Sequence, residues 1–165
     1  MSRLFTELVE SNLFKDWANT LDWLFDDESR FSEQKGWSRG YVGAFIKRIK
    51  KMPNWCKDEN YHYGQISLEL FEKLKNSSCT DTPKIYMSKS NGEGRDLIRH
   101  IRNGIAHGKT YPYKHNGVLC VKIFDYNKNK VPTAYISFPI HYIIEIHKKY
   151  LEQEKIIAHN RKKAA

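Results

Sequence analysis

The spacing of the apolar residues changes near Gly108, and this change constrains the fold of the 165-residue chain more than any other feature. Before Gly108, apolar residues recur at steps of three and four, which is typical of helices that pack on one face. After it, residues 117–126 and 133–138 are rich in β-branched and aromatic residues, and the turn-rich residues 127–132 separate them. This pattern is typical of a β-hairpin.

Helical spacing marks five segments, which are 4–25 (whole or broken near Ser11), 41–49 (ended by Pro53), 66–74, 91–107 and the segment after Pro139. The expected fold is therefore mostly α, an antiparallel helical bundle with a β-hairpin inserted before the C-terminal helix. We expect residues 1–160 to form a single domain and residues 161–165 to form a disordered basic tail.

The charge of the chain favours a polyanionic partner. The formal net charge is +9, with −5 over residues 1–34 and +14 over residues 35–165. Nucleic acid is the common polyanion of the cytoplasm, although the charge could serve solubility alone. No apolar run is long enough to span a membrane, and the acidic N-terminal segment makes export unexpected. The cysteines lie far apart, which predicts reduced thiols in the cytoplasm and no zinc site.

The segment 95–110 carries the candidate site. Ser90 and Glu93 have the spacing of a capping box, so we expect a helix over about 91–107 that Gly108 ends in a left-handed conformation. On a helical projection, the apolar stripe faces away from two other groups. One group is cationic and the other holds imidazoles and an amide; they are Arg95, Arg99 and Arg102, and Asp96, His100, Asn103 and His107. This polar face could simply be solvated. Gly104 costs about 1 kcal/mol inside a helix, which is tolerated where something must approach the backbone closely.

Residues 102–107, RNGIAH, resemble the signature of the HEPN (higher eukaryotes and prokaryotes nucleotide-binding) domains. That signature is an arginine, a polar residue and a histidine after four to six intervening positions, here Arg102, Asn103 and His107. The hairpin before the last helix looks most like the small HEPN proteins of bacterial plasmids. The resemblance covers most of the chain and implies a HEPN-like bundle.

The resemblance also implies a metal-independent endoribonuclease without a cofactor, a homodimer whose two motifs share one active-site cleft, and a role as toxin or phage-defence effector. A toxin of this kind would have an antitoxin or regulatory protein as a further partner. In related toxins a tyrosine often follows the histidine two positions on. Here that position is Lys109, so control by tyrosine adenylylation is not expected. The alternatives are a non-catalytic HEPN module that binds RNA or a protein, and a structural protein whose motif arose by chance.

The residue types suit RNA cleavage by the neighbouring 2′-hydroxyl. Arginine can donate two hydrogen bonds to a phosphate, and histidine can exchange a proton near neutral pH. Asn103 could orient the imidazole or the phosphate. The expected products are a 2′,3′-cyclic phosphate and a 5′-hydroxyl. Arg102 and His107 lie about 140° apart on an ideal helix, so either the helix loosens or the two residues act across a dimer.

The remaining polar residues have two readings each. Four cations could hold flanking phosphates or be ordinary surface residues, namely Arg95, Arg99, Lys109 and Lys114. Four aromatic residues could stack on bases or lie in the core, namely Trp55, Tyr111, Tyr113 and Tyr126. His100 could be a second functional imidazole or a plain surface residue, and we favour the surface. Asp96 either pairs with Arg99 or Arg102 or complements its own helix.

Overall fold

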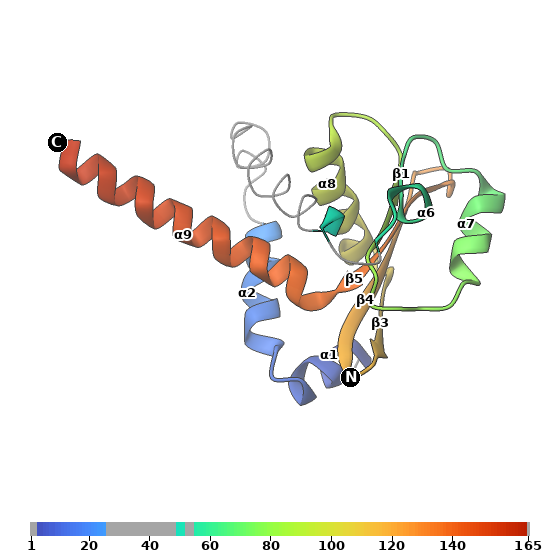
Figure 1. Cartoon of the computed structure of the whole chain (residues 1–165), viewed down its shortest axis with the longest axis horizontal. Helices are drawn as coiled ribbons and strands as arrows, with labels where there is room; N and C mark the ends of the chain where they lie inside the picture. The colour runs from blue at the N-terminus through green and yellow to red at the C-terminus, as the bar shows by residue number, and fades with distance from the viewer. Residues whose placement is uncertain (1–2, 26–48, 52–54, 165) are drawn as a thin grey trace.

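The computed structural model describes residues 3–25, 49–51 and 55–164, and it places helices around one sheet (Figure 1). In chain order the elements are α1 (Arg3–Glu10), α2 (Phe14–Leu24), α6 (Lys57–Asn60), β1 (Tyr61–Tyr63), α7 (Leu68–Lys75), β2 (Lys84–Met87), α8 (Glu93–Ala106), β3 (Thr110–His115), β4 (Val118–Tyr126), β5 (Pro132–Pro139) and α9 (Ile140–Ala164).

The five strands form one mixed sheet in the order β1-β2-β5-β4-β3. Strands β1 and β2 are parallel, and the other neighbours are antiparallel. The predicted hairpin is confirmed as β4 and β5, but the predicted mostly α fold, a helical bundle with one hairpin, is wrong. Strands β1 and β2 have three and four residues, too few to display an alternating pattern.

The sheet separates two apolar clusters, because successive residues of a strand face opposite sides. On one side, Val121 and Ile123 of β4 belong to the larger cluster with residues of α8 and α9. On the other side, Phe124 packs with Phe71 of α7 and Tyr135 of β5. Helix α8 therefore lies against the face of β4 opposite to the ring of Phe124.

Several helix boundaries follow the sequence patterns. The break near Ser11 is confirmed, with Asn12 at φ +57° between α1 and α2. The predicted helix over 41–49 lies outside the described residues apart from its end. Helix α9 runs to Ala164 and projects away from the sheet (Figure 1), while the tail over 161–165 stays a prediction. Among the described residues, no helix is long and apolar enough to cross a membrane.

His147 joins α9 to α2. Its ring stacks on Trp23 with 5.0 Å between centroids, and its Nδ1 lies 3.3 Å from Oγ1 of Thr20. The Thr20 hydroxyl donates to the carbonyl oxygen of Asp16 at 2.8 Å, so it accepts from His147. Burial lowers the pKa of His147, and the nearby Asp16 only partly offsets this effect. Burial of His147 between α9 and α2 thus favours the neutral imidazole.

We expect the folded protein to lose stability as the pH falls below about 6.5, the ordinary pKa of histidine. The pKa of His147 is lower in the folded chain, so the unfolded chain binds the proton first and acid favours unfolding. Urea unfolding of wild type and His147→Gln on both sides of neutral pH measures this effect. The glutamine variant should show a smaller loss, and an identical loss in both proteins would contradict the prediction.

Candidate functional site

The C-terminal end of α8 holds the histidine of the RNGIAH segment. The helix ends at Ala106, His107 is its C-cap, and Gly108 follows at φ +69°. The amide of Lys109 then donates to the carbonyl oxygen of Gly104 at 2.8 Å, which closes the last turn. The predicted glycine terminator is confirmed. His107 is exposed at this end of the helix.

Gly104 is the closest point between α8 and the sheet. A Cβ atom added at this buried glycine would stand 2.7 Å from the carbonyl oxygen of Phe124 and would overlap the side chain of Ile123. Only a glycine therefore allows the helix to approach β4 this closely. The backbone approach that the sequence indicates is made by the protein's own strand.

Gly104→Ala is expected to lower the free energy of unfolding by about 1–3 kcal/mol, because overpacking against backbone outweighs the gain in helix propensity. Urea unfolding measures the change. Ala106→Gly, at an exposed position of the same helix, should cost about 1 kcal/mol from propensity alone and calibrates that term. A Gly104→Ala protein as stable as wild type would mean that the contact is looser than described.

A buried histidine–aspartate pair joins α8 to β4, and its histidine lies two residues before the RNGIAH segment. Nδ1 of His100 donates to Oδ2 of Asp125 at 2.7 Å, and the amide of Asn103 donates to the same oxygen at 3.3 Å. His100 is 0% exposed and Asp125 is 3% exposed. The expectation of His100 at the surface is therefore wrong, because β4 covers α8 beyond its apolar stripe. Asn103 orients this pair.

Asp125 comes from a part of the chain that the site prediction does not include. It occupies an inward position of β4, in step with Val121 and Ile123. An acidic side chain at an inward position is costly unless it is paired. This position in the alternating pattern is the signal that could have led to Asp125.

A second buried carboxylate fixes the start of α8. Asp96, which is 0% exposed, accepts from the hydroxyl of Tyr63 at 2.5 Å, the amide of Ser90 at 2.8 Å and the guanidinium of Arg99 at 3.2 Å. Burial alone would raise the pKa of Asp96. These hydrogen bonds, together with that from the amide of Asn91, outweigh burial, so the pKa lies below its ordinary value. Of the two predicted salt-bridge partners of Asp96, the structure pairs it with Arg99.

The helix begins later than the capping-box pattern predicts. Its first residue is Glu93 and its N-cap is Gly92 at φ +104°, without a side-chain cap. The carboxylate of Asp96 takes the amides of Ser90 and Asn91 instead. Burial and the bond to Asp96 raise the pKa of Tyr63 to about 12. The phenol therefore remains a donor to this carboxylate at neutral pH.

Arg102 and His107 have different surroundings. Arg102 is half-buried, with its Cζ 5.7 Å from the centre of the Phe25 ring just after α2, whereas His107 is exposed. Asn103 is half-buried and donates to the carboxylate of Asp125. The structure thus gives the three predicted catalytic residues three different environments.

The predicted phosphate-binding residues also divide. Arg95 is half-buried, and Arg99 pairs with Asp96. Lys114 pairs with Glu7 at 3.1 Å, and Lys109 is exposed beside His107. The Trp55 indole donates to the carbonyl oxygen of Pro83 at 3.0 Å and packs against the core.

The described part of the chain contains no group of three His, Cys, Asp or Glu side chains placed to hold a metal ion. What the site offers is an exposed imidazole at the end of a helix. That helix is fixed by a close contact at Gly104 and by buried carboxylates at Asp96 and Asp125. Such an end can present a proton donor or acceptor in a defined position.

Comparison with known proteins adds one finding. Residues 30–161 match the family described as HEPN pEK499 p136. No curated protein and no solved structure matches the chain.

Proposed function

The chain belongs to the HEPN pEK499 p136 family, and from this premise we propose that it is a metal-independent endoribonuclease. Membership of a HEPN family suggests a nuclease or another RNA-related function. One observation carries the proposal: the histidine of the RNGIAH segment is exposed at the end of a helix whose position Gly104 and Asp125 fix. A histidine that only filled the core would not be placed in this way.

In the proposed reaction, the 2′-oxygen of RNA attacks the adjacent phosphorus and the bond from phosphorus to the 5′-oxygen breaks. His107 takes the proton of the 2′-hydroxyl or gives a proton to the departing 5′-oxygen. Arg102 stabilises the negative charge that develops on the phosphate oxygens. The products are a 2′,3′-cyclic phosphate and a 5′-hydroxyl, and solvent balances the remaining proton.

We propose further that two chains share this site. Arg102 and His107 lie about 140° apart on an ideal helix, and Arg102 is half-buried over Phe25 while His107 is exposed. His107 of one chain would therefore act with the partner subunit's Arg102 in a homodimer. The exposed end of α8 supports this arrangement, because it leaves the imidazole accessible to a second chain.

The test uses purified protein, end-labelled single-stranded RNA and EDTA. We expect cleavage with a 2′,3′-cyclic phosphate on the upstream fragment. Salt-sensitive RNA binding without cleavage would favour the alternative, a non-catalytic HEPN module. If the protein is a toxin or phage-defence effector, its induced expression in bacteria should arrest growth, and an antitoxin or regulatory protein would relieve the arrest.

A further inference from the structure

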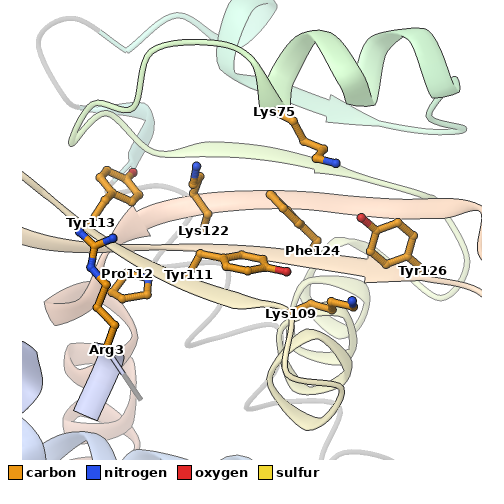
Figure 2. A pocket seen from close by; sticks show the side chains of 9 residues that line it. All are labelled: Arg3, Lys75, Lys109, Tyr111, Pro112, Tyr113, Lys122, Phe124 and Tyr126. Carbon is orange, nitrogen blue, oxygen red and sulfur yellow. The ribbon is translucent and has the colours of Figure 1, made fainter. Parts of the chain in front are cut away.

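A groove with aromatic and cationic walls crosses the face of the sheet at β3 and β4. It has a volume of about 580 Å³. Figure 2 shows Tyr111, Phe124 and Tyr126 in a row along the strands, with Lys75 above this row and Lys109 below it. The remaining lining residues are Arg3, Pro112, Tyr113 and Lys122. We call this feature the aromatic groove.

The pleat of the two strands explains why these side chains share one face. Tyr111 of β3 pairs with Lys122 of β4 in the antiparallel register, so both point to the same side as Phe124 and Tyr126. Helix α7 packs on this side through Phe71, whose ring lies 5.5 Å from that of Tyr126. Tyr111, on the outer strand, stays 40% exposed.

The exposed ring of Tyr111 has a firm support. Its centroid lies 5.2 Å from that of Phe124, which is only 6% exposed, and the two planes are tilted by 44°. Phe124 in turn contacts Phe71 and Tyr135 in the smaller apolar cluster. A ring held in this way can receive a planar ligand without first being ordered.

The charge of the groove is of one sign. Four of its nine lining residues are cationic and none of the nine is acidic. Lys109 is exposed, and Nζ of Lys122 lies 5.9 Å from the centre of the Tyr113 ring. Nζ of Lys75 lies 3.8 Å from the carboxylate of Glu72, which partly offsets the charge of this lysine. An anion with flat apolar parts complements this lining.

We propose that the aromatic groove binds single-stranded RNA, with a base stacked on Tyr111 and phosphates held by Lys109 and Lys75. Unpaired bases offer their flat faces to aromatic side chains, whereas a duplex hides them. The choice of RNA rests on the proposed function. The groove would hold nucleotides beside the phosphate that His107 acts on.

The main chain connects this groove directly to the end of α8. Lys109, a lining residue, is two positions after His107. Its amide bonds to Gly104 of the helix, and its carbonyl oxygen accepts from the amide of Phe124 at 3.0 Å. Lys109 therefore belongs both to the groove and to the turn that follows the candidate catalytic histidine.

The experiment measures the binding of a fluorescent single-stranded RNA by anisotropy, in the full-length His107→Ala protein so that no cleavage intervenes. Adding Tyr111→Ala should weaken binding about 5- to 150-fold, the range for loss of one stacked base. Tyr111→Phe keeps the ring and should bind like the background protein. Lys109→Ala should weaken binding and reduce its dependence on salt.

The matched control is Lys128→Ala, which removes the same charge from the exposed turn between β4 and β5. The proposal is overturned if Tyr111→Ala and Lys109→Ala bind no more weakly than this control, or if the corresponding DNA binds more tightly than the RNA. Circular dichroism checks that each variant is folded. Because binding is measured without cleavage, an inactive wild-type protein would reject the proposed catalysis and leave this result intact.

Discussion

Replacing His107 by alanine is expected to slow RNA cleavage by about 10²- to 10⁴-fold, the usual contribution of a general acid or base. The fold should remain intact, because the side chain is exposed at the end of α8 and surface substitutions usually change stability by less than about 0.5 kcal/mol. Initial cleavage rates with labelled RNA measure the effect. His159→Ala, at an exposed position of α9, should cleave at the wild-type rate.

Mixing two inactive variants distinguishes a shared site from a site within one chain. A dimer of Arg102→Ala with His107→Ala contains one site with both substitutions and one with neither, if each site takes one residue from each chain. Random exchange of subunits should then restore about a quarter of the wild-type activity. No recovery in dimers that have exchanged would reject the shared cleft. A His107→Ala protein as active as wild type would reject the catalytic assignment itself.

Asp125→Ala is expected to lower the free energy of unfolding by about 1–3 kcal/mol or more, the cost of leaving buried hydrogen-bond donors without an acceptor. The loss would leave His100, which is 0% exposed, and the amide of Asn103 without their shared acceptor. Urea unfolding measures it. The double variant His100→Ala/Asp125→Ala should lose less than the sum of the two single losses, because each single change strands the other group.

The chain supplies a control with the same two residue types at an exposed position. His115 and Asp81 also form a histidine–aspartate pair, at 3.2 Å, but their side chains are 32% and 43% exposed. Asp81→Ala should therefore cost less than about 1 kcal/mol. Equal losses of stability in Asp81→Ala and Asp125→Ala would show that burial does not strengthen the contribution of the His100–Asp125 pair.

Local patterns predicted α8 and the β4–β5 hairpin but missed β3, although β3 has six residues. Strands β4 and β5, with nine and eight residues, are rich in β-branched and aromatic residues, and most of their residues are buried because both faces of the sheet are covered. Helix α8 shows its apolar stripe and its glycine terminator. The parallel pairing of β1 with β2 depends on residues distant in the chain, and no local period encodes it. Strands β1, β2 and β3, which extend the hairpin on both sides, are the reason that a five-stranded sheet replaces the expected bundle.

The candidate site divides in the same way. The order of Arg102, Asn103 and His107 can be read along the chain, and their catalytic roles remain predictions. The partners that fix the helix cannot be read in this way, since Asp125 comes from β4 and Tyr63 from β1. A helical projection also treats every polar face as open to solvent, although tertiary contacts bury His100.

The contact at Gly104 fixes the position of the end of α8 relative to strand β4. Phe124 meets this glycine through its carbonyl oxygen, while its ring faces the opposite side of the strand and supports Tyr111. Phe124 thus helps to fix both the helix that carries His107 and the ring of Tyr111. A change at Phe124 would therefore disturb the end of α8 and the aromatic groove together.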